Sequence, residues 1–268
     1  MRTVGCVPYV NAAPLVWRFK QPGSPVRVLY DVPSRLPAML EAGQADAVLA
    51  SSYDALATPG RRVAAGVGIC SNGPVASVRL FSRVPFADIE TLALDSASLT
   101  SNHLAQILLG ELHGVRPRLS TLPPDQSAML AQCDACVLIG DIGMRSPSEG
   151  LYVMDLGEAW TQMTGLPFVW AMWIGGTRLD EALATTLEAA SRLDLAEWEE
   201  MVSATAATSG WPLETVGRYL RENVYHAGGE EEMQGLALFG EKMLANKLVD
   251  LLNTPDVVED LRARSSSS

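Results

Sequence analysis

The sequence predicts an α/β protein in which two lobes face a central cleft and a helical part follows at the C-terminal end. Aliphatic runs alternate with helical patterns before Thr177, and only helical patterns follow it. Ala38-Met39-Leu40 precedes Asp46-Ala47-Val48-Leu49, and Ala128-Met129-Leu130 precedes Asp134-Ala135-Cys136-Val137-Leu138. This internal similarity is typical of two lobes that are built alike.

The first half of the chain is expected to contain strands that each end in a turn or a helix. The apolar run from Val4 predicts a buried strand that Pro8 ends, and Pro14 suits the first turn of a helix. Further strands are expected at 26–30, 46–50, 62–66, 68–70 and 75–81, with a helix at 33–42 that stops at Gly43.

The pattern restarts around residues 83–88. Strands are expected at 92–94, 118–122, 136–139, 152–156 and 168–173. Helices are expected at 98–113, at 124–130 and up to Thr164. The later helices are expected at 180–193, 196–207, 212–224 and from near Glu230. The last one has an apolar stripe that should face the core, formed by Met233, Leu236, Phe239 and Met243 and continued by Leu244, Leu248 and Leu251.

Composition excludes several classes of protein. The chain has 268 residues, 48% hydrophobic and 19% charged, which is typical of a globular protein. Its net charge of −11 argues against binding to nucleic acid. No apolar run reaches the roughly 20 residues of a membrane span, and no signal peptide precedes Val4. We therefore expect a cytoplasmic protein. Cys133 and Cys136 lack further ligands, so they predict buried thiols and no metal site.

Two side chains at predicted turns are candidates for catalysis. Asn11 follows the first strand, and ligands of α/β proteins bind beyond the carboxyl ends of strands. We take Asn11 as the centre of the site; the alternative is that it only caps a helix. Asp141, after Ile139-Gly140, is a candidate general base or hydroxyl acceptor, and the alternative is again a helix cap.

Hydroxyl groups cluster at three other turns. Ser98, Thr100 and Ser101 stand at a predicted helix start, where free backbone N–H groups and the helix dipole favour an anion. The other two turns carry Ser51 with Ser52, and Ser71 and Gly73 with Ser77. These residues are either plain caps or parts of a carboxylate site, since backbone dipoles act at short range whatever the net charge.

Taken together, several stretches resemble one family, the chorismate dehydratases of the futalosine route to menaquinone. The family motifs are S-Y-L-N-x-x-P-L, P-S-x-L, D-x-x-x-x-S-S, G-P-V-x-S-V-x-L-F-S and S-x-T-S. The matching stretches are Pro8 to Leu15, Pro33 to Leu36, Asp46 to Ser52, Gly73 to Ser82, Ser98 to Ser101, Leu138 to Asp141 and Asp155 to Val169. The resemblance covers residues 3–175. Val7 departs from the serine that is usual there.

The resemblance implies a type-II periplasmic-binding-protein-like fold, with crossings between the lobes near 83–86 and 171–174. Residues 1–85 and 173–268 would then form lobe 1 and residues 86–172 lobe 2. It also implies loss of water from a small-molecule substrate, chorismate, giving 3-[(1-carboxyvinyl)oxy]benzoate with no cofactor. No nucleic acid or membrane partner is expected, and a homodimer is left open.

The implied chemistry assigns roles to the candidate residues. Our hypothesis is that the enolpyruvyl carboxylate of the substrate takes the proton, while Asn11 orients it or hydrogen-bonds the leaving hydroxyl; Asp141 is the alternative base. Substrate carboxylates would be held by Ser51, Ser52, Ser71, Gly73, Ser77, Ser98, Thr100 and Ser101. The competing interpretations are a solute-binding protein for a small carboxylate and the related 1,4-dihydroxy-6-naphthoate synthase.

Overall fold

Six strands form the first sheet, in the spatial order β11-β4-β10-β3-β1-β2. Their bounds are Arg2–Cys6 for β1, Val26–Tyr30 for β2, Ala47–Ser51 for β3, Arg62–Ser71 for β4, Phe168–Gly175 for β10 and Asp256–Val258 for β11. β1 is parallel to β2 and β3, whereas β10 is antiparallel to β3 and β4. The structure is a computed structural model that describes residues 1–258.

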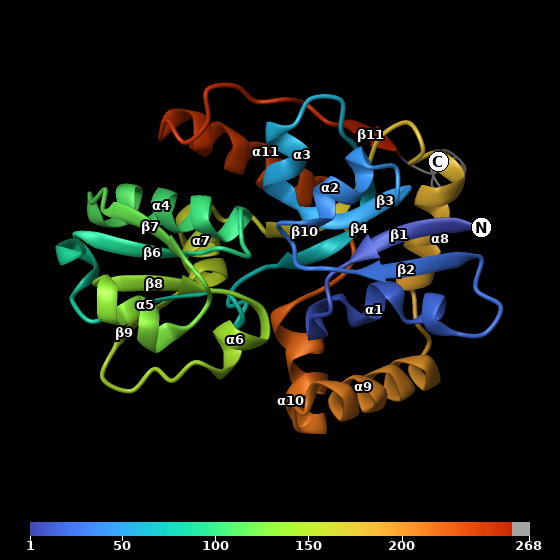
Figure 1. Cartoon of the computed structure of the whole chain (residues 1–268), viewed down its shortest axis with the longest axis horizontal. Coiled ribbons are helices and arrows are strands. Elements are labelled where there is room, and N and C mark those ends of the chain that lie inside the picture. Colours follow the sequence, from blue (N-terminus) through green and yellow to red (C-terminus); the bar gives the residue numbers. More distant parts are fainter. Residues whose placement is uncertain (259–268) are drawn as a thin grey trace.

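Five strands form the second sheet, in the order β7-β6-β8-β5-β9. Their bounds are Arg79–Ser82 for β5, Thr91–Asp95 for β6, Arg118–Leu122 for β7, Ala135–Leu138 for β8 and Tyr152–Asp155 for β9. β6 is parallel to β7 and β8, and β5 is antiparallel to β8 and β9. The two sheets lie side by side as the centres of two lobes (Figure 1).

Helices cover both faces of each sheet (Figure 1). The helices of the second lobe are α4 (Thr100–His113), α5 (Gln126–Gln132), α6 (Gly140–Arg145) and α7 (Leu156–Thr164). Those of the first lobe are α1 (Ala13–Val16), α2 (Leu36–Glu41), α3 (Ser52–Ala57), α8 (Glu181–Ser191), α9 (Leu195–Ser209), α10 (Leu213–Arg218) and α11 (Glu230–Ala245). Short turns of 3-10 helix lie at Val10–Ala12, Arg18–Lys20 and Phe86–Asp88, and a π-helical turn at Tyr219–Asn223. No helix among residues 1–258 is long and apolar enough to cross a membrane.

Capping residues explain where several helices begin and end. The Asp155 carboxylate accepts the N–H groups of Gly157 and Glu158 at the start of α7. At the start of α9 the Asp194 carboxylate accepts the N–H of Glu197, and the Glu197 carboxylate accepts the N–H of Asp194, which completes a capping box. Gly114 closes α4 with a φ of 71°, a left-handed conformation that glycine adopts without a steric cost.

Aromatic and aliphatic side chains fill the core between the first sheet and α11. The ring centroids of Phe168 and Phe239 lie 5.1 Å apart, and those of Trp160 and Phe168 are also 5.1 Å apart. In the predicted apolar stripe of α11, Leu236, Phe239 and Met243 are buried, which confirms that this face is part of the core. The prediction was wrong for Leu244 and Leu251, which are exposed. All four cysteines are free and buried, as the sequence predicted.

The chain changes sheets earlier than the expected crossings. It enters the second sheet between β4 and β5, over residues 72–78, and returns between β9 and β10, over residues 156–167. The expected crossings differ because β5 pairs with β8 and β9, and because residues 171–174 lie inside β10. The division into lobe 1 (1–85 and 173–268) and lobe 2 (86–172) stays a prediction, and residues 259–268 of it lie outside the described chain.

Candidate active site

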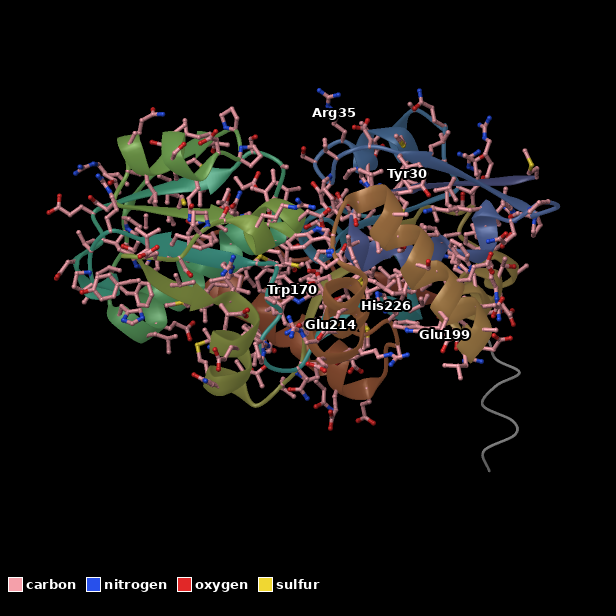
Figure 2. All side chains as sticks on the ribbon, turned by 90° about the horizontal axis from the view of Figure 1, so that it is seen from below. Tyr30, Arg35, Trp170, Glu199, Glu214 and His226 are labelled. Atoms are coloured by element: carbon pink, nitrogen blue, oxygen red, sulfur yellow. The ribbon has the colours of Figure 1, made fainter. Side chains whose placement is uncertain are left out.

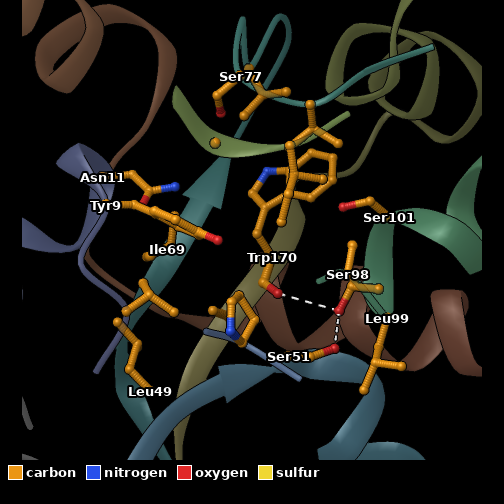
Figure 3. A pocket seen from close by; sticks show the side chains of 18 residues that line it. Tyr9, Asn11, Leu49, Ser51, Ile69, Ser77, Ser98, Leu99, Ser101 and Trp170 are labelled. Carbon is orange, nitrogen blue, oxygen red and sulfur yellow. Dashed lines mark hydrogen bonds between the residues drawn. The ribbon is translucent and has the colours of Figure 1, made fainter. Parts of the chain in front are cut away.

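A cavity lies where the two lobes meet. Figure 3 shows Asn11 and Tyr9 on one side of it, Ser98 and Ser101 on the other, and Trp170 between them. Its polar lining residues are Tyr9, Asn11, Ser51, Ser77, Ser98, Thr100 and Ser101. Six of the predicted site residues therefore converge on one cavity, although they come from separate turns of the chain.

The Asn11 carboxamide is left without a partner for its oxygen. Asn11 lies in the 3-10 turn after β1, where Pro8 ends the strand and Pro14 stands in the first turn of α1. The Oδ1 atom of Asn11 is buried and has no hydrogen-bond partner within residues 1–258. Such an oxygen costs about 1–3 kcal/mol if it stays unpaired. This oxygen is therefore a candidate acceptor for a hydrogen bond from a bound molecule.

The Thr100 hydroxyl joins the two lobes beside this cavity. It contacts the Ser51 hydroxyl, and it lies 3.3 Å from the Ser52 hydroxyl and 3.3 Å from the backbone nitrogen of Tyr53. The backbone carbonyl of Trp170 is 3.4 Å away (Figure 3). Hydroxyls of the two lobes thus meet directly at the end of β3, where the sequence predicted anion-binding groups.

The N-terminus of α4 is open to the cavity. The residue that precedes the helix is Leu99, so no side chain in the described chain caps its first turn. Backbone N–H groups of a first turn have no partner within the helix and carry partial positive charge. Ser98, Thr100 and Ser101 line the cavity here and add hydroxyl donors. This wall suits an anionic group.

Ser77 lines the cavity on the segment that joins the two sheets. Its Oγ accepts a hydrogen bond of 2.8 Å from the Tyr219 hydroxyl. The same segment is fixed by the Asp155 carboxylate, which accepts the N–H groups of Val75 and Ala76 at 3.0 and 2.7 Å. The position of Ser77 is therefore set by groups of both lobes.

Three predicted binding residues do not line the cavity. The Ser71 hydroxyl accepts the indole N–H of Trp170 at 3.0 Å, so it positions a wall of the cavity from behind. Ser52 is fully buried beside Thr100. The N–H of Gly73 donates to the Thr161 hydroxyl at 2.9 Å. Direct contact of these residues with a substrate remains an untested prediction.

Asp141 lines an adjoining pocket together with Lys20, Tyr30 and Thr205. Val7 and Tyr9 line both cavities. Burial raises the pKa of the Asp141 carboxyl, although the Val10 N–H and the positive charge of Arg145 oppose this shift. The carboxylate thus links α6 of the second lobe to the turn that carries Asn11.

Tyr9 and Trp170 are lining residues that the sequence analysis did not propose. Burial raises the pKa of Tyr9 to about 12, and Asp95 and Asp141 add to the shift, so its hydroxyl is neutral at pH 7. Tyr9 could have been found because it stands two residues before Asn11. Trp170 lies inside β10, and the pattern of apolar residues along this strand does not distinguish Trp170 from a core residue.

His226 is a further residue that sequence reasoning missed. It lies near the middle of the molecule, like Trp170, whereas Arg35 extends into solvent (Figure 2). Its Nε2 atom is 2.7 Å from the backbone carbonyl of Asn11. Burial lowers the pKa of His226 to about 4, so the ring is neutral at pH 7 and its Nε2–H donates to that carbonyl. No sequence motif marks this contact.

Solved structures confirm the predicted fold. The alkanesulfonate-binding protein SsuA of Xanthomonas axonopodis bound to MOPS matches with a TM-score of 0.67 at 17% identity, covering 96% of this chain and 98% of that one. The periplasmic aliphatic sulphonate binding protein SsuA of Escherichia coli gives 0.63 at 18% identity, with coverage of 98% and 91%. The chain therefore has a periplasmic-binding-protein-like fold.

Sequence comparison supports the resemblance that the motifs indicated. A chorismate dehydratase of Thermus thermophilus is 29% identical over 260 residues, which cover 90% of this chain and 94% of that protein. A family model described as menaquinone biosynthesis matches residues 2–244. Because this match spans both lobes and most of the helical C-terminal part, the chain belongs to the menaquinone biosynthesis family.

Proposed function

We propose that this protein is a chorismate dehydratase, a carbon–oxygen lyase that converts chorismate to 3-[(1-carboxyvinyl)oxy]benzoate and water. The observation that carries the proposal is that two features share one cavity. An amide oxygen without a partner, on Asn11, shares the cavity with the uncapped N-terminus of α4. The name of the Thermus thermophilus relative and the family match support the same activity.

The proposed substrate has the groups that this cavity suits. Chorismate carries two carboxylates and one hydroxyl on or near a six-membered ring. The α4 N-terminus with Ser98, Thr100 and Ser101 offers N–H and O–H donors for a carboxylate. The Asn11 oxygen offers an acceptor for a hydroxyl.

The reaction breaks one C–H bond and one C–O bond. The hydrogen on the ring carbon that carries the enolpyruvyl ether is acidic, because the electron pair left behind delocalises into the ring carboxylate. That pair then expels hydroxide from the neighbouring carbon, the ring becomes aromatic, and the departing hydroxide takes up a proton to form water. Donors aimed at the ring carboxylate stabilise the charge that develops there.

We assign the proton transfer to the substrate itself. Among the described residues that line the Asn11 cavity there is no carboxylate, lysine or histidine. The enolpyruvyl carboxylate of chorismate would take the proton, and Asn11 would hydrogen-bond the leaving hydroxyl. In this scheme Asp141 acts from the adjoining cavity by holding α6 against the Val10 N–H, and it becomes the base only if its removal abolishes turnover.

A second candidate function is a solute-binding protein for a small carboxylate, which the likeness to the two SsuA structures favours. We prefer the enzyme because of the family match, and we place it in the cytoplasm, without a cofactor. Whether it acts as a monomer or a homodimer does not enter the proposal, since the cavity is built from one chain.

The test is to mix the purified protein with chorismate alone and to look by mass spectrometry for a product lighter by one water. We expect turnover, and we expect Asn11→Ala to lower it by about 10²-fold, the usual cost of one polar group aimed at the reacting centre. Asn253→Ala is the matched control, since Asn253 does not line this cavity. A thermal shift with chorismate but no product would favour the solute-binding protein. Full activity of Asn11→Ala together with loss of activity in Asp141→Ala would make Asp141 the base.

A further inference from the structure

Ala76 has an unusual backbone conformation beside the cavity. Its φ is 62°, and among residues 1–258 only one other residue that is not glycine, Lys247, has a positive φ. Lys247 follows the end of α11, where a left-handed residue is common. Ala76 instead lies between β4 and β5, directly before the cavity residue Ser77. Because residues held in such a conformation concentrate at functional sites, Ala76 points to a role for the turn that carries Ser77.

The turn around Ala76 is of a strained type. The Ser77 N–H donates to the Val75 carbonyl at 2.7 Å, so this hydrogen bond closes a three-residue turn with Ala76 at its centre. Such a bond around a residue of positive φ is the pattern of the classic γ-turn, which is rare and strained. For a residue other than glycine, a positive φ is disfavoured by roughly 5–30-fold. Other contacts must therefore hold Ala76 in place.

The Asp155 carboxylate supplies these contacts and divides them between its two oxygens. Its Oδ1 atom accepts the N–H groups of Gly157 and Glu158 at the start of α7, at 3.0 and 3.1 Å, and that of Val75 at 3.0 Å. Its Oδ2 atom accepts the N–H of Ala76 at 2.7 Å and no other hydrogen bond from the described chain. One oxygen thus caps the helix, while the other is reserved for the strained residue.

The strained turn determines where the Ser77 hydroxyl lies. Moving Ala76 to an ordinary φ of about −60° would rotate the chain at this point by about 120° and displace Ser77. In the present turn Ser77 is 1% exposed, and its Oγ accepts the Tyr219 hydroxyl at 2.8 Å. Because Ser77 accepts that proton and lines the cavity (Figure 3), its own O–H is available as a donor to a ligand oxygen.

Both connections between the two sheets meet at Asp155. It ends β9, directly before the connection over residues 156–167. The segment that it holds, residues 72–78, is the other connection. Tyr219, from the first lobe, also contacts Ser77. The Ser77 hydroxyl is therefore placed relative to both lobes.

We propose that Ala76 and Asp155 are positioning residues: Asp155 Oδ2 holds the turn at Ala76 in its strained form, and this turn keeps the Ser77 hydroxyl where it donates to an anionic oxygen of the substrate. Asp155 does not line the cavity, so it acts through Ser77. The inference deepens the proposed function and rests on it for the identity of the substrate. The geometry of the turn does not depend on what the cavity binds.

The test uses Asp155→Asn. Its amide oxygen keeps the place of Oδ1, where three N–H groups lie, so its NH2 group faces the Ala76 N–H. Asparagine caps helices as well as aspartate does, so the start of α7 is kept. We expect kcat/KM for chorismate to fall about tenfold, the effect of one buried hydrogen bond. Asp125→Asn, which changes the cap of α5 in the same way, is the matched control and should keep wild-type kcat/KM. Wild-type kcat/KM in Asp155→Asn would overturn the inference.

Two substitutions at Ala76 distinguish positioning from a general loss of stability. Glycine adopts a positive φ without a steric cost, so Ala76→Gly added to Asp155→Asn should raise kcat/KM by about threefold or more. Ala76→Val leaves Asp155 intact, but a β-branched residue barely tolerates this φ, so it should lower kcat/KM about tenfold. This second variant decides the matter if Asp155→Asn does not fold. A loss in Asp155→Asn that Ala76→Gly does not reduce, or wild-type kcat/KM in Ala76→Val, would overturn the inference.

Crystal structures of wild type and Asp155→Asn separate this inference from the proposed function. We expect a negative φ at residue 76 of Asp155→Asn and loss of the hydrogen bond between Tyr219 and Ser77. A positive φ with Ser77 in its wild-type place contradicts the inference even if chorismate is turned over. The expected change supports the inference even if the purified protein does not dehydrate chorismate, in which case only the proposed function fails.

Discussion

Replacing Thr100 by valine tests whether one hydroxyl holds the lobes together beside the cavity. The Thr100 hydroxyl meets the hydroxyl of Ser51 and lies 3.3 Å from the Tyr53 nitrogen in the first lobe. Valine keeps the size and branching of threonine, and the two residues have similar helix propensity. The substitution therefore removes the contacts between the lobes while the shape of the side chain is kept.

The expected loss of stability follows from the lengths of these hydrogen bonds. Only the contact with Ser51 is short, since the others lie at 3.3–3.4 Å, the weak end of the range for hydrogen bonds. We count about 1 kcal/mol for the lost bond and about 1 kcal/mol more for the Ser51 hydroxyl that is left buried without a partner. A loss of about 2 kcal/mol corresponds to a Tm that is lower by roughly 4–8 °C in a chain of this size.

The assay measures both the Tm and the kcat/KM for chorismate dehydration. If the closed arrangement of the lobes loses the same free energy, kcat/KM falls by up to about 30-fold. Thr121→Val, on the exposed strand β7 of the same lobe, is the matched control and should change neither quantity. A Thr100→Val protein with the Tm and kcat/KM of wild type would refute the role assigned to this hydroxyl.

Three further predictions concern single positions. Gly140 has a φ of 58°, and an added Cβ would lie 3.4 Å from the Tyr9 ring. We expect Gly140→Ala to lower the free energy of unfolding by about 1–2 kcal/mol, measured in urea, and to lower kcat/KM. Unchanged values of both quantities would contradict this. An alanine at Gly143 would place its Cβ 2.3 Å from the Ser77 carbonyl. Gly143→Ala should therefore lower the free energy of unfolding by about 2 kcal/mol or more, measured by urea unfolding. A urea midpoint equal to that of wild type would be inconsistent with the packing of α6. Burial lowers the pKa of His226 to about 4, below the ordinary 6.5, so the unfolded state binds more protons between pH 6.5 and pH 4 and stability falls by up to about 3 kcal/mol as the pH drops through this window. His226→Gln, which keeps an N–H donor, should lower this pH dependence of Tm, and an identical pH profile would argue against it.

Local sequence signals predicted the helices and strands whose ends are marked by turn-forming residues. The strand at 26–30 has the expected limits, and the helix expected at 98–113 ends at His113 as predicted although it begins at Thr100, because proline and glycine residues mark these ends. The break expected between residues 66 and 68 is absent, since β4 runs without interruption from Arg62 to Ser71. Gly68 lies where the Ala171 carbonyl of β10 comes within 2.7 Å of its Cβ position, so this glycine allows close approach of a neighbouring strand.

Elements that depend on distant partners were not predictable in the same way. The helices α3 and α6 have six residues each, too few to show a helical period, and β11 is a three-residue strand at the sheet edge. The sheet to which β5 belongs is decided by its pairing with β8 and β9, which no local pattern contains. For this reason the crossings between the lobes were expected too late along the chain.

The residues of the candidate site divide in the same way, into those that local sequence predicts and those that depend on distant partners. Asn11, Ser77 and Thr100 were predicted because polar residues that follow strands point to the same edge of a sheet. Tyr219 and His226 were missed, because they come from a helical region whose sequence shows only amphipathic spacing. Their contacts with Ser77 and Asn11 span 142 and 215 residues along the chain.

The return of residues 219–226 to the first strand has a consequence for synthesis on the ribosome. Asn11 emerges among the earliest residues, yet His226, which donates a hydrogen bond to the Asn11 backbone carbonyl, is made 215 residues later. At usual translation speeds of about 5–20 residues per second, a nascent chain spends roughly 10–40 s with its first strand made but without the hydrogen bond to the Asn11 carbonyl. Fragments that end before Tyr219 should therefore be inactive even where both sheets have formed.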